Sequence, residues 1–151
     1  MGYRSSKTFG HELGLSCAFR QWRADHSHCS KLHGYAISVH FEFESEELDA
    51  RNWVMDFGGF KGVKQMLQDT FDHKVVIASD DPNKEFFRQG HLLGVMDVVE
   101  IPAVGCEKFA EYCYCIANTV LRQEMGDRVK IKEVTVREHG ANSATYTGKE
   151  A

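Results

Sequence analysis

Proline and long apolar runs are scarce in this sequence. Only two of its 151 residues are proline, Pro82 and Pro102, so no proline-rich linker divides the chain. No apolar stretch approaches the roughly 20 residues that a membrane-spanning helix needs, and no membrane partner is expected. Because the length suits one domain, we predict a single domain over residues 1–151.

Positive charge is not in excess either. The net charge of −4 provides no broad basic surface, so nucleic acid is not an expected partner. The five cysteines are odd in number and unevenly spaced, which argues against a secreted disulfide framework. We therefore expect reduced thiols and a cytoplasmic location.

Two segments alternate apolar and polar residues in the manner of strands. The first runs from about Phe9 to Gln21, and the second, YAISVHFEFE, begins at Tyr35. A polar loop over about residues 22–32 separates them. We expect these two long strands to pair in an antiparallel arrangement.

The rest of the chain predicts helices and shorter strands. Helices are expected after the glycine pair of DFGGF, in DDPNKEFFRQG with Asp81 as its cap and Gly90 at its end, and over about residues 106–125. Short strands are expected in DHKVVIA and MDVVEIP. The last strand, VKIKEVTVREHG, changes the parity of its apolar residues, which predicts a bulge near Lys132 and Glu133.

This order of elements predicts an α+β fold, in which an antiparallel sheet carries its helices on one face. A sheet that is covered on one face leaves strand surfaces and edges exposed. Such surfaces favour contact with further copies of the chain, so we expect a homo-oligomer.

Several polar side chains fall where a site can form. His33 keeps the parity of the second predicted strand, and Cys29 lies just upstream of it. Glu138 keeps the parity of the apolar residues in the last strand, and a buried carboxylate is costly unless the N–H donors of a ligand meet it. Asp72 beside His73 is the usual arrangement for orienting a base. For each residue the alternative is a packed or solvated side chain, and free cysteines commonly fill cores.

The order of the motifs carries more information than any single motif. Cys-x-x-x-His-Gly, MDFGGFK, FDHK, GCEKFA and VREH follow one another along the chain. This order resembles the 6-pyruvoyl-tetrahydropterin synthase / 6-carboxy-tetrahydropterin synthase family, over about residues 9–146. The three residues between Cys29 and His33 are more similar to the spacing in 6-carboxy-tetrahydropterin synthases of the queuosine pathway.

The resemblance implies a fold and an activity. It implies the tunnelling fold, in which subunits join into barrels, typically trimers paired into hexamers, with active sites between subunits. It also implies a lyase reaction on 7,8-dihydroneopterin triphosphate, with loss of triphosphate and of part of the side chain.

The resemblance also assigns roles to residues. Cys29 matches the catalytic cysteine, which must be deprotonated to move a proton on the substrate. Asp72 and His73 match the pair that completes the proton relay. Glu138 matches the glutamate that anchors the pterin by accepting from a ring N–H and an amine together, and Glu107 matches a second glutamate near the pterin. If sites lie between subunits, Cys29 and Glu138 serve one pocket from different chains.

The implied metal site departs from the family's pattern. The family's zinc is held by three histidines, whose positions fall on Phe19, His33 and Tyr35 here. Phenylalanine cannot bind a metal and neutral tyrosine is a poor zinc ligand, whereas catalytic zinc needs three protein ligands. Two alternatives stay open: a zinc site rebuilt from His33, His28 and His26, or a zinc-less homologue that binds a pterin or purine without synthase activity or with altered chemistry.

The triphosphate of such a substrate needs basic partners. Candidate side chains near the proposed pocket are Arg20, Arg23, Lys31 and Lys74. The sequence does not distinguish between them.

Overall fold

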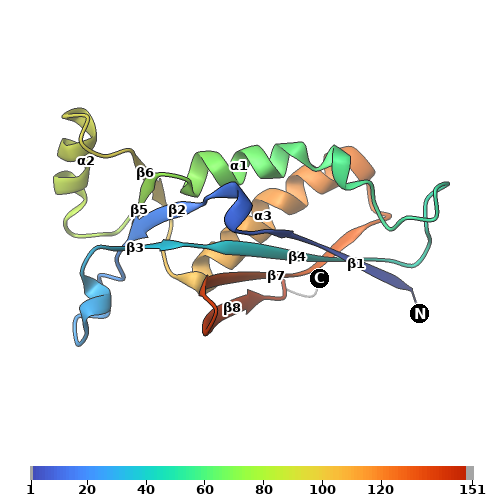
Figure 1. Cartoon of the computed structure of the whole chain (residues 1–151), viewed down its shortest axis with the longest axis horizontal. Coiled ribbons are helices and arrows are strands. Elements are labelled where there is room, and N and C mark those ends of the chain that lie inside the picture. The colour runs from blue at the N-terminus through green and yellow to red at the C-terminus, as the bar shows by residue number, and fades with distance from the viewer. Residues whose placement is uncertain (1, 149–151) are drawn as a thin grey trace.

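The computed structural model describes residues 2–148 and arranges their strands in two sheets (Figure 1). In spatial order, the first sheet contains β1 (Tyr3–Phe9), β4 (Ser38–Ser45), β7 (Lys130–His139) and β8 (Asn142–Tyr146), all antiparallel. The second contains β3 (His33–Ala36), β2 (Ser16–Phe19), β5 (Lys74–Ala78) and β6 (Val98–Ile101). β2 is antiparallel to β3 and parallel to β5, and β5 is parallel to β6.

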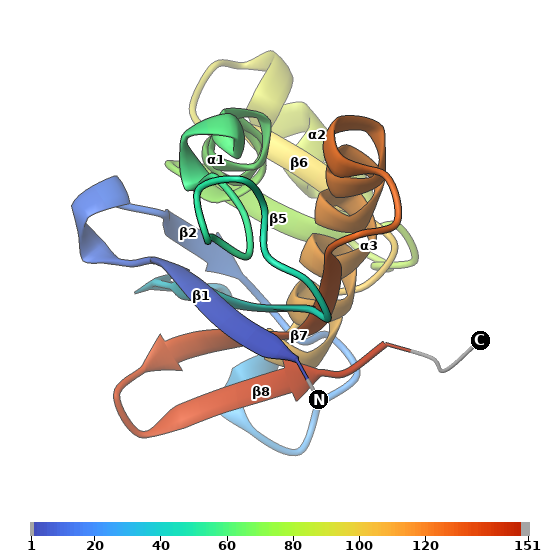
Figure 2. The ribbon, with the colours of Figure 1, turned by 90° about the vertical axis from the view of Figure 1, so that its right-hand side faces the viewer.

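Helices and short 3₁₀ turns connect these strands. The helices are α1 (Lys61–Phe71), α2 (Lys84–Leu92) and α3 (Cys106–Met125). The 3₁₀ turns are η1 (His11–Leu13), η2 (His28–Ser30) and η3 (Phe57–Gly59). Figure 2 shows α1 and α3 on the same side of the first sheet. The predicted α+β class, with helices on one face of an antiparallel sheet, is confirmed. None of the helices formed by residues 2–148 is long and apolar enough to cross a membrane.

Aromatic side chains fill the space between the first sheet and the helices. Phe41 and Phe43 of β4 are fully buried and pack edge-on against Phe60, with ring centroids 5.6 and 5.3 Å away. On the helix side, Phe71 of α1 packs edge-on against Phe109 of α3 at 5.1 Å. Each such burial contributes roughly 1.5–3 kcal/mol. The alternation in the second predicted segment therefore identified core residues correctly.

The first predicted strand is wrong as a single element. Residues 9–21 contain the end of β1, the turn η1 and then β2. Gly14 has a φ of 82° and Leu15 a φ of 40°, so the backbone turns while the apolar pattern continues. Leu15 is fully buried, so the alternation of apolar residues continues through this segment because the turn itself packs into the core.

The second predicted strand is also divided. β3 belongs to one sheet and β4 to the other, with Ile37 between them. The Ile37 N–H donates to the Leu15 carbonyl at 3.2 Å, and the Ile37 side chain is fully buried. Because Ile37 keeps the apolar parity through the bend, periodicity does not reveal the change of sheet. The predicted antiparallel pairing is found between β2 and β3 and, at Phe9 with Val39, between β1 and β4.

The boundaries of α2 differ from the prediction. The helix begins at Lys84 with Asn83 as its cap, and Gly90 lies inside it. Asp81 lies one turn before the helix, where its Oδ1 accepts the Asn83 N–H at 2.8 Å and its carbonyl accepts the Lys84 N–H at 3.2 Å, and the same carboxylate forms a buried ion pair with Arg20. A polar residue before a helix can therefore bind the backbone at the helix start and a distant partner together.

The C-terminal half follows its prediction more closely. α3 has the predicted bounds, and the bulge in β7 is confirmed, since Glu42 faces Glu133 while the next residue, Phe43, faces Ile131. Lys132 is thus the extra residue. β8 has no counterpart among the predicted elements, and neither do the parallel pairs of the second sheet.

Candidate functional site

The Asp72–His73 pair lies at the start of β2. Asp72 follows α1, and its Oδ1 accepts a hydrogen bond from the backbone N–H of Ser16 at 3.3 Å. His73 donates its own backbone N–H to the Ser16 carbonyl at 2.6 Å. The Nδ1 atom of His73 lies 3.0 Å from Asp72 Oδ1, and the ring is 85% exposed. A carboxylate therefore orients an imidazole that is open to a second molecule.

Cys29 lies beyond the opposite end of β2, in η2. Its N–H donates to the Ser27 hydroxyl at 3.1 Å, and its carbonyl accepts from the Gln21 N–H at 2.8 Å. These bonds fix the backbone of Cys29 while its side chain stays partly exposed. At about 3.3 Å per residue, roughly 10–16 Å of strand separates Cys29 from the Asp72–His73 pair. A single chain does not bring Cys29 and His73 together.

Arg20 ties the Cys29 turn to the second sheet. Its guanidinium donates to both oxygens of Asp81, at 2.9 and 2.7 Å, and to the Ser30 carbonyl at 3.2 Å. The Asp81 side chain is only 1% exposed. The hydrogen bonds from Arg20 hold the pKa of Asp81 below its usual range. Arg20 is thus occupied as a positioning residue for the turn.

Two of the other basic candidates are also paired. Arg23 lies 2.6 Å from a carboxylate oxygen of Asp80, and Lys74 pairs with Asp97. Lys31 is exposed and forms no ion pair within residues 2–148. Lys31 is therefore the candidate best able to meet an anionic group of a ligand.

Phe19, His33 and Tyr35 lie together on one face of the second sheet. Phe19 is paired with His33 across β2 and β3, and Tyr35 follows two residues later on the same face. The ring centroids are 6.1 Å apart for Phe19 and His33, 5.8 Å for Phe19 and Tyr35, and 5.1 Å for His33 and Tyr35. His33 Nδ1 lies 2.7 Å from the Lys31 carbonyl, and its Nε2 lies 3.0 Å from the Tyr35 hydroxyl.

These three residues occupy the positions that the resemblance assigns to zinc, and they do not fit a metal. The phenyl ring of Phe19 has no donor atom, and both nitrogens of His33 are engaged in hydrogen bonds within the chain. His26 and His28 are exposed in the preceding loop. Within residues 2–148, no group of three His, Cys, Asp or Glu side chains is arranged to hold a metal ion. The structure does not gather His33, His28 and His26 into a rebuilt site.

Glu138, near the end of β7, lies at the same end of the molecule as Tyr35. It is half-buried and adjoins Cys106, the first residue of α3. Burial raises the pKa of the Cys106 thiol to about 12, and the Glu138 carboxylate contributes to that rise. Burial also raises the pKa of Tyr35, with further contributions from Glu138 and then Cys29. Glu138 and Cys29 of one chain thus both act on the Tyr35 hydroxyl, and the assignment of Cys29 and Glu138 to one pocket from different chains stays a prediction.

Glu107, the remaining candidate, lies in the first turn of α3 with an exposed side chain. Two features of the site were missed from the sequence. The Arg20–Asp81 pair joins residues 61 positions apart, and no local pattern announces it. The hydrogen bond between His33 and Tyr35 did have a signal, because residues two apart on a strand share a face.

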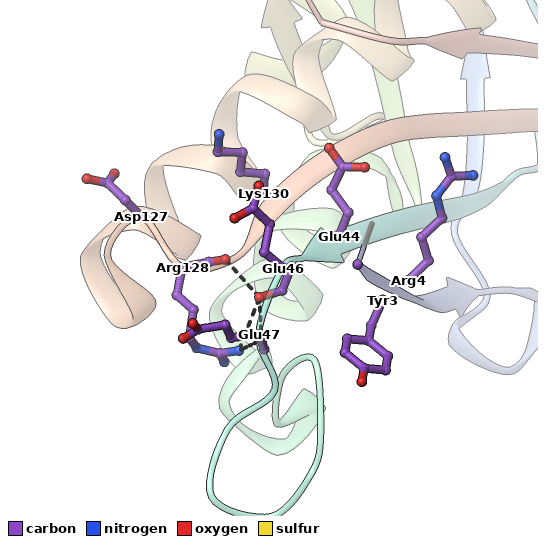
Figure 3. A pocket seen from close by; sticks show the side chains of 10 residues that line it. Tyr3, Arg4, Glu44, Glu46, Glu47, Asp127, Arg128 and Lys130 are labelled. Carbon is purple, nitrogen blue, oxygen red and sulfur yellow. Dashed lines mark hydrogen bonds between the residues drawn. The ribbon is translucent and has the colours of Figure 1, made fainter.

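A cavity of about 710 Å³ lies elsewhere, at the far end of the first sheet (Figure 3). Its lining comes from the start of β1, the end of β4 and the segment leading into β7. The Arg128 guanidinium links two parts of the lining by donating to the Glu47 carbonyl at 3.0 Å. The side chains around the cavity are a mixture of acidic and basic residues. None of the predicted site residues lines this cavity, so it is not the candidate site.

Comparisons with known proteins identify the family and the fold. A family model described as 6-pyruvoyl tetrahydropterin synthase matches residues 10–149. No curated protein matches the sequence.

Several solved structures are similar in fold. An uncharacterized protein from Wolinella succinogenes has a TM-score of 0.81 at 21% identity, with 99% of each chain covered. The 6-pyruvoyl tetrahydropterin synthase of Plasmodium vivax has a TM-score of 0.67 at 18% identity, covering 95% of this chain and 97% of that one. The Caenorhabditis elegans enzyme has a TM-score of 0.64 at 19% identity, covering 99% and 96%. These likenesses show a shared fold over nearly the whole length.

Proposed function

The chain belongs to the 6-pyruvoyl tetrahydropterin synthase family and has its tunnelling fold, and on this basis we propose that it binds a pterin through Glu138. Pterin synthases of this kind are lyases. The proposed reaction is that of a 6-carboxy-tetrahydropterin synthase acting on 7,8-dihydroneopterin triphosphate, in pterin or queuosine-type 7-deazaguanine biosynthesis.

The observation that carries the proposal is the environment of Glu138. Its carboxylate is half-buried at the end of β7 and has no ion-pair partner within residues 2–148. A carboxylate in such a place is stabilised by N–H donors that a ligand brings. A pterin presents a ring N–H and an exocyclic amine side by side, which matches the two carboxylate oxygens.

The proposed roles of the other residues follow from their geometry. Cys29, partly exposed beside Tyr35, would act as the thiolate that moves a proton on the substrate. Asp72 and His73 would complete the proton relay, with His73 as the exchanging group. Because one chain holds Cys29 and His73 roughly 10–16 Å apart, the complete site requires a second copy. We therefore propose a homo-oligomer, a trimer or hexamer, whose subunits join into a barrel.

The proposal is tested by replacing Glu138 with glutamine. Glutamine keeps the shape but turns one acceptor into a donor that faces the ligand's own N–H groups. Pterin affinity, followed by the fluorescence of the pterin, is expected to fall roughly 10- to 100-fold, since charge-assisted hydrogen bonds contribute about 1.5–3 kcal/mol. Glu133→Gln on the same strand is the matched control. Equal affinities in the wild type and Glu138→Gln contradict the proposal.

A second candidate is a zinc-less homologue that binds a pterin or purine without the synthase reaction. Two observations favour it: the metal positions hold residues that do not fit zinc, and Arg20, Arg23 and Lys74 are already paired with carboxylates. Release of triphosphate from 7,8-dihydroneopterin triphosphate separates the candidates. Turnover that Cys29→Ala abolishes supports the lyase, and pterin binding without turnover supports the binding protein.

A further inference from the structure

We propose that the pocket works without a metal, and that Phe19, His33 and Tyr35 form an aromatic triad in which the hydrogen bond between His33 and Tyr35 presents the Tyr35 hydroxyl to a hydroxyl or N–H group of the ligand. The nature of the ligand rests on the proposed function. The absence of a zinc site rests only on the residues of the triad and their contacts.

The backbone that would support a metal site is intact. β2 and β3 place residue 19 opposite residue 33, and residue 35 opposite Cys17, all on one face. Side chains at directly opposite positions have Cβ atoms about 5 Å apart, and residues two apart on a strand point the same way. The paired backbone of β2 and β3 therefore brings these three positions together, and the side chains at 19 and 35 are not zinc ligands.

Packing fixes the first member of the triad. The Phe19 side chain is 1% exposed, and its ring meets Phe109 of α3 edge-on at a centroid distance of 4.9 Å. Phe19 also touches the rings of His33 and Tyr35. Rotating it away would open a hole in the core between the second sheet and α3, so it stays in the place that a metal ligand would need.

Hydrogen bonds fix the other two members. A backbone carbonyl only accepts, so the bond of 2.7 Å from His33 Nδ1 to the Lys31 carbonyl requires the proton on Nδ1. In the neutral imidazole Nε2 is then an acceptor, and the Tyr35 hydroxyl, 3.0 Å away, donates to it. The lone pair that would bind zinc is already used by the phenol.

This arrangement changes what the pocket offers to a ligand. A zinc ion attracts an anionic or chelating oxygen. The Tyr35 oxygen, whose proton points at His33, keeps a free lone pair and accepts a hydrogen bond instead. Since Glu138 accepts hydrogen bonds from the N–H groups of the pterin ring, Tyr35 can accept a hydrogen bond from a donor on a substituent of that ring. The triad thus selects ligands with a hydroxyl or amine substituent and needs no chelation.

The first experiment measures metal and pterin affinity together. Wild-type protein purified in the presence of zinc is expected to hold less than about 0.1 zinc per chain, and its pterin Kd is expected to stay within about 2-fold after treatment with a chelator. The double variant F19H/Y35H restores three histidines on the same frame and is expected to take up about one zinc per chain. A wild type with one zinc per chain, lost in His33→Ala or with pterin affinity that falls on chelation, overturns the inference.

Phe19→His can disturb the core, so a second variant keeps the test decisive. Tyr35→His alone leaves Phe19 in place and frees Nε2 of His33, giving two imidazoles that face one another. Its zinc affinity in a competitive titration is expected to exceed that of the wild type by at least about 10-fold. A folded Tyr35→His variant with unchanged zinc affinity shows that the Tyr35 phenol is not what keeps His33 Nε2 from a metal, and overturns this part of the inference.

The second experiment tests the hydroxyl. Tyr35→Phe keeps the ring and is expected to weaken binding of neopterin, which carries a hydroxylated side chain, by about 3- to 10-fold. Pterin without a side chain is expected to bind as before, whereas a merely structural role would weaken both ligands equally. Tyr3→Phe, at the far end of the first sheet, is the control. If the wild type binds neither ligand, the proposed function fails, and the zinc measurements still decide the metal question separately.

Discussion

At the start of β2, the Asp72 carboxylate lies 3.0 Å from an exposed His73 imidazole, whereas Phe19 at the end of β2 and Tyr35, paired with Cys17, stand at positions where metal ligands were expected. The pair needs only two adjacent residues at a helix end. A metal site needs three donors that converge, so two substitutions remove it. In this chain the Asp72–His73 pair is therefore present where two of the three expected metal ligands are replaced.

The largest effect is expected from Asp72→Asn. Asparagine still accepts from the Ser16 N–H but cannot stabilise a charged His73, so turnover of 7,8-dihydroneopterin triphosphate is expected to fall about 10²- to 10⁴-fold. Triphosphate release measures the rate, and pterin Kd is expected to stay unchanged. Asp69→Asn, on the same helix and bonded to Gln65, is the control. An unaltered rate in Asp72→Asn would show that the Asp72–His73 pair takes no part in turnover.

At the other end, Phe19→Ala is expected to destabilise the fold. Removing a phenyl ring that is 1% exposed leaves a cavity against Phe109, which costs about 3–5 kcal/mol. Urea unfolding followed by circular dichroism measures the loss. Phe86→Ala, at a site that is 65% exposed, is the matched control and is expected to change little. A loss in Phe19→Ala as small as in the control would show that Phe19 does not hold the triad in place.

The anchor of the Cys29 turn gives a pH-dependent effect. Asp81→Asn leaves Arg20 without its carboxylate, and the free energy of unfolding at neutral pH is expected to fall by about 3 kcal/mol. Because Arg20 lowers the pKa of Asp81 in the folded state, the pair's contribution is complete above the unfolded pKa of about 3.9. It is lost as the pH falls through the lower folded pKa.

Thermal unfolding between pH 7 and pH 2 measures this dependence. The stability of Asp81→Asn is expected to vary less with pH over the acidic range than that of the wild type. Asp80→Asn, which removes the exposed partner of Arg23, is the control and is expected to have a smaller effect at every pH. Parallel curves for the wild type and Asp81→Asn would show that the Arg20–Asp81 pair does not couple to pH.

The smallest effect is expected from His28→Ala. The side chain is exposed in the loop before Cys29, so stability is expected to change by less than about 0.5 kcal/mol and zinc content not at all. His33→Ala is the comparison, because it removes hydrogen bonds to Lys31 and Tyr35. Zinc that is bound by the wild type and lost in His28→Ala would show that His28 is a metal ligand, and would contradict the absence of a metal site near Phe19 and Tyr35.

Local patterns predicted much of the fold. The bounds of α3, the bulge at Lys132 and the buried residues of β4 all follow from periodicity within one element. The Asp72–His73 geometry is also local, since adjacent residues at a helix end meet without help from distant segments. The placement of Tyr35 beside the end of β7, where its ring centroid lies 6.1 Å from that of His139, was not foreseen, because it depends on how β3 and β7 converge.

Residue identity and spacing alone were enough to predict the class of fold, the family, the apolar faces of the strands and helices, and the replacement of two expected metal ligands. Long-range packing set the division of the two predicted long strands between the two sheets. Long-range packing also set the ion pair between Asp81 and Arg20 and the hydrogen bonds of both His33 nitrogens. The physical reason is that each of these depends on a contact whose partner cannot be read from local spacing, such as Ile37 with Leu15 or Phe19 with Phe109.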